Sequence, residues 1–134
     1  NSGIFINVQE LPHVPTAWQS GPEYQILGAD HMDYDVPEKR PGCLYVFLPQ
    51  QNNVEIKQGD WNKTTIKQKD GKIQFYLNGL ITAEEDLTTP EWKNKVAASH
   101  FSNYPEFGKT TAGQIALQYW YFETWFRNIK IREL

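Results

Sequence analysis

The sequence has little of what many enzyme and binding-site signatures need. Its 134 residues include a single cysteine, Cys43, which excludes an internal disulfide and any metal site built from several cysteines. No apolar run reaches the roughly 18 residues that a membrane helix needs. A net charge of −3 with interspersed signs gives no basic footprint for nucleic acid. We therefore expect neither a membrane span nor a nucleic-acid partner.

The familiar catalytic motifs are missing as well. The chain has no Gly-x-Ser-x-Gly nucleophile elbow, no His-Glu-x-x-His zinc motif and no glycine-rich phosphate loop. It also has no internal repeat and no low-complexity tract. Its apolar content of 40% and aromatic content of 14% suffice for a folded core, and its length suits one domain.

The sequence does contain short strand patterns separated by turn signals. Asp70-Gly71 and Asn78-Gly79 predict two hairpins, because a type I′ turn needs positive φ at both central residues. Further strands are predicted over residues 2–8, 23–27, 43–48, 60–69 and 115–134. Capping residues and a proline predict one helix of about ten residues from Pro90. The pattern is typical of an all-β fold, an antiparallel β-sandwich with one short helix.

The last stretch, residues 115–134, contains neither glycine nor proline and is rich in aromatic and β-branched residues. From Trp125 onward, alternation places Arg127 on an apolar face with Ile129 and Ile131. Because an unpaired buried charge is unfavourable, Arg127 needs a partner. That partner is either a structural carboxylate or carbonyl, or an anionic or sugar-hydroxyl ligand.

Two polar side chains share one face of the strand predicted over residues 23–27. Glu23 and Gln25 are two positions apart, so a pleated strand places them side by side. A carboxylate at such a place can orient a sugar hydroxyl, bind a metal or act as a base. The alternative is a structural acid paired with Arg127.

A polar loop follows that strand and carries Asp30, His31, Asp33 and Asp35. Carboxylates a few residues apart on a turn can converge on a hard cation. The loop lacks the spacing and the glycine of a calcium loop, so a solvated surface loop is the other interpretation.

Aromatic residues form a third group of candidates. Tyr119, Trp120, Tyr121 and Phe122 follow one another, and successive residues of a strand face opposite sides. The run therefore cannot be wholly buried, and part of it must contact a groove, a neighbouring subunit or an upstream strand. Exposed aromatic rings stack on the C–H faces of sugars, which points to carbohydrate.

A set of motifs occurs in one order along the whole chain: Asn1-Ser-Gly-Ile-Phe5, Gly21-Pro-Glu-Tyr-Gln-Ile-Leu27, His31, Gly42-Cys-Leu-Tyr45, Asp60-Trp-Asn62, Leu77-Asn-Gly79, Pro90-Glu-Trp92, Gly113-Gln-Ile-Ala-Leu-Gln118 and Trp125-Phe-Arg-Asn-Ile-Lys-Ile131. Together they resemble the 3-keto-disaccharide hydrolase family, formerly a domain of unknown function in secreted bacterial proteins. Such a set is far more specific than any single motif.

The resemblance implies a jelly-roll β-sandwich of the concanavalin A-like lectin and glucanase type. It implies a hydrolase acting on 3-keto-disaccharides or related oxidised glycosides, in the periplasm or outside the cell. The family usually has several strands before the Asn-Ser-Gly-Ile motif. Residues 1–134 are therefore expected to be a single β-sandwich domain without its N-terminal strands, completed by an upstream segment or a partner chain.

The resemblance also implies roles for the polar cluster. Glu23 and His31 would be catalytic, with Glu23 as base or metal ligand and Arg127 fixing it. The residues expected to bind the carbohydrate are Gln25, Gln118, Arg127, Trp120 and Tyr119. A divalent metal ion is compatible with this pattern, but the sequence specifies no ligand set for it.

The chain departs from the family pattern at two places. It has Tyr119-Trp120-Tyr121 where the family typically has Asp-His-Gly, and Gly28 where an Asp is frequent. Aromatic rings replace groups that carry protons or bind metals. Two alternatives to an enzyme therefore stay open: a non-catalytic carbohydrate-binding sandwich, and a structural or interaction module whose aromatic residues cover a partner chain.

Overall fold

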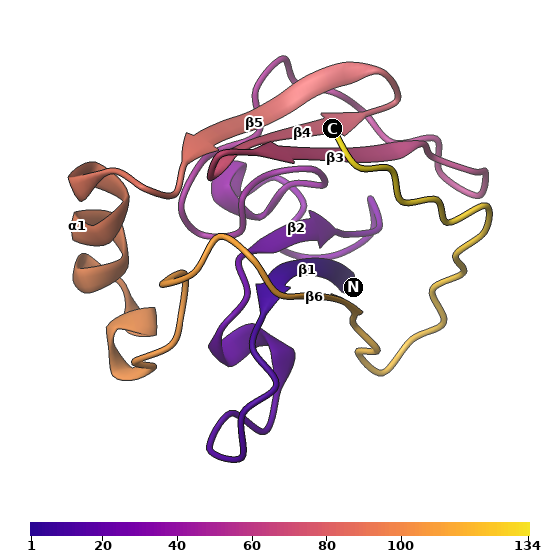
Figure 1. Cartoon of the computed structure of the whole chain (residues 1–134). Helices are drawn as coiled ribbons and strands as arrows, with labels where there is room; N and C mark the ends of the chain where they lie inside the picture. The colour runs from indigo at the N-terminus through magenta and orange to yellow at the C-terminus, as the bar shows by residue number, and fades with distance from the viewer.

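A computed structural model describes residues 1–134, whose six strands form two antiparallel sheets of three strands each. Sheet A has the order β2-β1-β6, with β1 over Ser2–Val8, β2 over Glu23–Ile26 and β6 over Gln114–Leu117. Sheet B has the order β3-β4-β5, with β3 over Thr64–Lys69, β4 over Lys72–Leu77 and β5 over Leu80–Asp86. The two sheets lie one above the other in Figure 1, which confirms the predicted all-β class.

The core lies between the two sheets. Alternation along β2 and β4 directs Tyr24, Ile73 and Phe75 inward, where all three are buried. The rings of Tyr24 and Phe75 lie 5.2 Å apart, and the Tyr24 hydroxyl donates to the Tyr76 carbonyl at 3.2 Å. This contact ties sheet A to sheet B.

Both predicted hairpins of sheet B are confirmed. Asp70 and Gly71 have φ values of 51° and 78°, and Asn78 and Gly79 have 51° and 88°. These positive values are those that a type I′ turn needs at its two central residues. Asp-Gly and Asn-Gly therefore set the register of β3, β4 and β5.

The predicted helix is confirmed as α1, Pro90–Ala98, at one end of the two sheets (Figure 1). Thr89 is the N-cap, since its Oγ1 accepts from the Trp92 N–H at 3.1 Å. Trp92 is fully buried and donates its indole N–H to the Gly108 carbonyl at 2.9 Å. With nine residues, α1 is neither long nor apolar enough to cross a membrane, and no other helix is.

Three short 3-10 helices complete the regular structure, over Ala17–Gln19, Pro37–Lys39 and His100–Asn103.

The strand predicted over residues 43–48 is wrong in its second half. Cys43 and Tyr45 bond to the backbone of β2, but Val46 takes a φ of 59°. The chain then turns, and the Leu48 N–H donates to the Leu44 carbonyl at 3.0 Å. An extended run of apolar residues thus becomes a tight turn against β2.

The strand predicted over residues 115–134 is also largely wrong. Only β6, Gln114–Leu117, is a strand, and the tail, residues 119–134, runs past the open side of the molecule toward sheet B (Figure 1). The tail contains one backbone–backbone hydrogen bond, from the Phe122 N–H to the Trp120 carbonyl. A strand pattern in sequence gives a strand only where a neighbouring strand supplies hydrogen-bond partners, and the tail has none.

Candidate functional site

The candidate site lies on the face of sheet A that points away from the core. The register pairs Phe5 with Glu23 and Gly3 with Gln25, whereas Tyr24 points into the core. The side chain of Glu23 lies over Gly3, because a Cβ at position 3 would come within 2.7 Å of its Cδ. Glycine at position 3 thus makes the room that the Glu23 carboxyl occupies.

Two amides share this face with Glu23. Gln25 is buried, and its Oε1 accepts from the Ile26 N–H while its Nε2 donates to no group of the chain. The Gln118 N–H donates to the Gly3 carbonyl at 2.9 Å, and strand alternation places the Gln118 side chain with Ala116, on the face of Phe5 and Glu23. Neither end of the Gln118 amide is bonded to the protein. The face therefore offers free hydrogen-bonding groups around one carboxyl.

The carboxyl of Glu23 is partly buried and forms no ion pair or side-chain hydrogen bond. Desolvation disfavours its charged form and raises the pKa of Glu23 to about 8. The carboxyl is therefore mostly protonated at neutral pH and can donate a proton. Perturbed, unpaired acids of this kind are typical of functional sites.

Residues 41–45 line the free edge of β2 and support the site. The Tyr45 N–H donates to the Glu23 carbonyl at 3.0 Å, and the Gly42 N–H donates to the Gln25 carbonyl at 2.8 Å. The segment therefore fixes the backbone on which both polar side chains stand.

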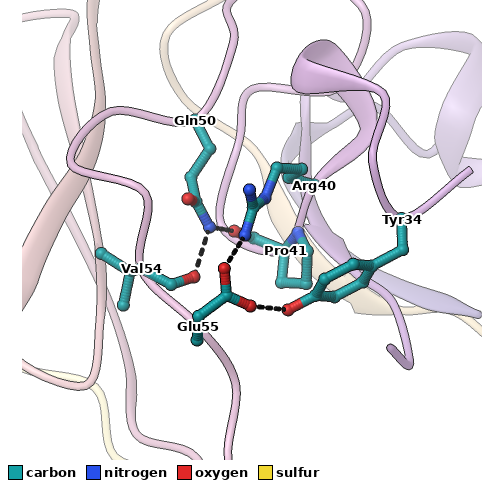
Figure 2. A network of polar contacts seen from close by, with 6 residues as sticks. All are labelled: Tyr34, Arg40, Pro41, Gln50, Val54 and Glu55. Carbon is teal, nitrogen blue, oxygen red and sulfur yellow. Dashed lines mark hydrogen bonds and ion pairs between the residues drawn. The ribbon is translucent and has the colours of Figure 1, made fainter. Parts of the chain in front are cut away.

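A polar network holds that segment in place, and Figure 2 shows its members. Gln50 Nε2 donates to the Pro41 carbonyl at 2.6 Å. Arg40 Nη2 and the Tyr34 hydroxyl both donate to Glu55, at 2.6 and 2.7 Å. These two hydrogen bonds, the Tyr34 bond first, lower the pKa of the Glu55 carboxyl. The long irregular stretch between β2 and β3 is thus ordered by side chains.

His31 forms no hydrogen bond or ion pair with Glu23. Its Nδ1 accepts from the Asp33 N–H at 3.1 Å within the polar loop, and Asp33 forms an ion pair with Lys39 at 3.1 Å. No three histidine, cysteine or acidic side chains lie together in a way that could hold a metal ion.

Arg127 does not pair with Glu23 either. Its guanidinium lies 3.9 Å from the centre of the Trp61 ring, a cation–π contact on the surface. Tyr119 and Trp120 begin the tail directly after Gln118, and both are exposed. The structure thus brings together Glu23, Gln25 and Gln118 and leaves Arg127 and His31 outside the group.

Residues 1–132 match the family described as the 3-keto-alpha-glucoside-1,2-lyase-like domain. The chain belongs to this family. The resemblance expected from the motifs is confirmed by this match and by a relative named 3-keto-disaccharide hydrolase, from Bacteroides thetaiotaomicron. That relative is 29% identical over 156 residues, which cover 100% of this chain and 54% of the relative.

Two solved structures of candidate glycosyl hydrolases from Parabacteroides distasonis are similar to this family member. One has a TM-score of 0.78 at 25% identity, covering 88% of this chain and 58% of that chain. The other has a TM-score of 0.55 at 27% identity, covering 65% and 44%. The chain therefore spans about half the length of these relatives, and the names of its relatives support a hydrolase at the level of the family.

Sequence reasoning missed two residues that shape the site of this lyase-like domain. Gly3 was read as part of a motif, and only the pairing of β1 with β2 shows that its missing side chain accommodates Glu23. Tyr45 is half-buried, and its pKa is raised mainly by desolvation, with a further contribution from the charge of Glu23. A phenol so placed can donate to a ligand, but no sequence signal placed residue 45 beside β2.

A hollow also lies on the outer face of sheet B. Three of its acids are engaged: Glu84 accepts from Gln74, Glu85 pairs with Lys95, and Asp86 accepts from Thr88. Its lining residues are Lys67, Lys69, Asp70, Lys72, Ile73, Gln74, Glu84, Glu85, Asp86 and Leu134. Solvated, paired charges do not make a catalytic group, so we place the site at Glu23.

Proposed function

We propose that the outer face of sheet A binds a glycoside oxidised at C3, and that Glu23 is the acid–base group of its cleavage. The observation that carries this proposal is the unpaired Glu23 carboxyl, held over Gly3 and desolvated until its pKa reaches about 8. The proposed substrate class comes from the names in the family. One relative is named 3-keto-disaccharide hydrolase, and the description of the family contains the substrate name 3-keto-alpha-glucoside.

Cleavage of a glycosidic bond at neutral pH requires a proton donor. Breaking the bond between C1 and the glycosidic oxygen leaves an alkoxide, which must take up a proton as it departs. The protonated Glu23 carboxyl gives its proton to that oxygen. Water then adds its hydroxide to C1 and returns its proton to Glu23, so atoms and charge balance. Because the acid form is required, turnover falls as pH rises through about 8.

The amides around Glu23 orient the ring. The free Nε2 of Gln25 donates to a sugar hydroxyl or to the C3 carbonyl, and the Gln118 amide can donate and accept. A donor of a buried amide that lacks a protein partner, such as Gln25 Nε2, gains most from such a ligand.

The first experiment measures turnover of 3-keto-glucosides and of unmodified disaccharides, with and without an added divalent cation. We expect Glu23→Gln to lower kcat by roughly 10²–10⁴-fold, the usual range for a general acid, with an unchanged circular dichroism spectrum. Glu84→Gln makes the same chemical change on the outer face of sheet B and leaves kcat unchanged. Full activity of Glu23→Gln would remove Glu23 from the mechanism.

A pair of glycine variants tests the geometry. Gly3→Ala displaces the Glu23 carboxyl, whereas Gly28→Ala displaces only the Asp30 carboxylate, whose Oδ1 would lie 2.8 Å from the new Cβ. Both displace the flexible end of an acid, so both proteins fold. We expect turnover to be lost only in Gly3→Ala. Equal activity of the two variants contradicts the arrangement proposed for Glu23.

A second candidate function rests on the exposed aromatic residues that follow Gln118. Trp120 and Tyr121 form an edge-to-face pair with ring centres 5.2 Å apart, and such a pair can stack on a sugar. A non-catalytic binding domain predicts no turnover, but sugar-dependent quenching of tryptophan fluorescence. Trp120→Ala then abolishes the quenching and Glu23→Gln preserves it, the reverse of the pattern expected for the enzyme.

We also propose that the two sheets belong to a jelly-roll sandwich of the concanavalin A-like type, and that the protein acts outside the cytoplasm. The solved structure with a TM-score of 0.78 supports the fold. The expected location rests on the family resemblance. Fractionation of cells that produce the complete protein tests it, and recovery of the protein in the cytoplasm contradicts it.

A further inference from the structure

A hollow of about 390 Å³ lies where β1 ends, between sheet A and the loop that follows β1. Most of the residues that line it are apolar: Val8, Leu11, Val14, Pro15, Ala17 and Ala116. The Gln9 amide nitrogen also belongs to this region, but it already donates to the Asn7 and Ala112 carbonyls. We call this feature the apolar hollow, since it offers a ligand mainly apolar contact.

The apolar hollow opens on the same face of sheet A as Glu23. The register pairs Phe5 with Glu23 on one side and with Ala116 on the other, and residues paired in this way share a face. Val8 pairs with Gln114, which has the same parity as Ala116. Figure 1 shows the loop after β1 below sheet A, on the side away from sheet B. This loop therefore forms a wall beside the face that carries the candidate site.

The distance from the acid to the apolar hollow suits a glycoside. The Glu23 carboxyl lies over Gly3, and the Gly3 carbonyl accepts from the N–H of Gln118 on the neighbouring segment. Ala116 precedes Gln118 by two positions on the same side, a separation of about 7 Å along a strand. A sugar ring that contacts Glu23 and Gln118 can therefore place the group on its glycosidic oxygen in the apolar hollow.

We propose that the apolar hollow is the subsite for the leaving group, and that this group is a neutral aromatic ring rather than a second sugar. The inference rests on the function proposed above and adds the class of aglycone. A second sugar would bury hydroxyls against apolar side chains, and a buried hydroxyl without a hydrogen-bond partner is unfavourable. An aromatic ring has no such hydroxyls to satisfy, and its burial removes apolar surface from water.

The charge beside the apolar hollow favours a neutral ring. Glu10 is among the lining residues and forms no ion pair. Its carboxylate therefore repels an anionic aglycone such as a benzoate. A phenol or another uncharged aryl alcohol avoids this repulsion.

Kinetics with three substrates test the subsite: phenyl 3-keto-glucoside, methyl 3-keto-glucoside and a 3-keto-disaccharide. Leu11→Asp places a charge in the apolar hollow, and Leu80→Asp makes the same change at the turn between β4 and β5. Both leucines are exposed, by 37% and 55%, so both variants are expected to fold. We expect the lowest KM of the wild type for the phenyl substrate.

The variants should then differ in one value. We expect Leu11→Asp to raise KM for the phenyl substrate by roughly tenfold, the order that one apolar contact supplies, and to leave KM for the methyl substrate unchanged. Leu80→Asp leaves both values unchanged. Equal effects of Leu11→Asp on the phenyl and methyl substrates would overturn the proposal. A lowest KM for the disaccharide that Leu11→Asp raises would overturn it as well, because the apolar hollow would then hold a sugar.

A binding measurement without turnover separates this inference from the proposed function. Phenyl and methyl glucoside are added to the Glu23→Gln variant, and the methyl signals of Val8, Leu11 and Val14 are followed by NMR. We expect only the phenyl glucoside to shift these signals. The same shifts without cleavage of any 3-keto-glycoside by the wild type would end the proposed function and support the aromatic subsite. Cleavage by the wild type without these shifts would overturn the subsite alone.

Discussion

At the scale of single residues, the unpaired carboxyl group of Glu23 makes the free energy of unfolding depend on pH. Glu23 has a pKa of about 8 in the fold against 4.5 when unperturbed. Between these values the native state holds a proton that the unfolded state has released, so the free energy of unfolding falls as pH rises. Below 4.5 both states are protonated, and above about 8 both are charged, so this contribution no longer changes.

We therefore expect Glu23→Gln to stabilise the protein relative to wild type by an amount that grows with pH. The difference in unfolding free energy rises by ~1.4 kcal/mol for each pH unit between about 5 and 8 and then levels off. Urea denaturation at a series of pH values measures it. Glu84→Gln, a change at a surface acid, gives a flat difference. A flat difference for Glu23→Gln as well would mean that its pKa is not raised.

The site could be predicted in part from single residues. Alternation placed Glu23 and Gln25 on one face, and the family resemblance added Gln118, which the structure brings to the same face. Alternation singled out Arg127, and His31 was part of the polar loop, before the resemblance assigned both to the cluster. In the structure Arg127 contacts Trp61 and His31 bonds to Asp33. Contacts between segments far apart in sequence depend on packing, which periodicity does not encode.

At the scale of elements, α1 depends on the side chain that begins it. Thr89 Oγ1 accepts from the Trp92 N–H at 3.1 Å, and its hydroxyl donates to the Asp86 carbonyl at 3.0 Å. We expect Thr89→Ala to lower the free energy of unfolding by about 1 kcal/mol, since one amide of the first turn loses its acceptor. Thr89→Ser keeps the hydroxyl and most of the stability. Equal losses in the two variants, measured by urea denaturation, would show that capping is not the cause.

Elements with local signals were predicted well, and those that depend on a neighbour were not. The Asp70-Gly71 and Asn78-Gly79 turns and the capped helix are set by residues within each segment. The last strand was predicted from composition and from the alternation after Trp125, but residues 119–134 lack an adjacent backbone. Strand propensity describes the fit to a pleated surface, and that surface must exist.

At the scale of the whole molecule, two amides join the sheets. Asn7 of β1 and Gln68 of β3 exchange a pair of hydrogen bonds, each of 3.0 Å. Asn7 stands at an irregularity of β1 with a φ of 56°, a value that asparagine tolerates better than most residues. The irregular backbone of sheet A at Asn7 thus directs the Asn7 amide toward Gln68 of sheet B.

We expect the two sheets to be energetically coupled through this pair. Asn7→Gly keeps the positive φ accessible and removes the amide, and Gln68→Ala removes its partner. Each variant alone loses stability, and the double variant loses about 1 kcal/mol less than the sum of the two. A double-mutant cycle by urea denaturation measures this coupling. Strict additivity would show that this pair of amides does not couple the two sheets.

The labelling rate of the single cysteine reports local opening of the structure beside β2. Cys43 is fully buried, its thiol donates to the Glu38 carbonyl at 3.0 Å, and burial raises its pKa. A thiol reagent therefore reacts only in the moments when residues 41–45 detach from β2. The rate of labelling therefore measures how often residues 41–45 separate from β2, the strand that carries Glu23. We expect a sugar bound on the Glu23 face to lower the labelling rate of Cys43. A labelling rate that does not change with added sugar would mean that no ligand stabilises the contact between residues 41–45 and β2.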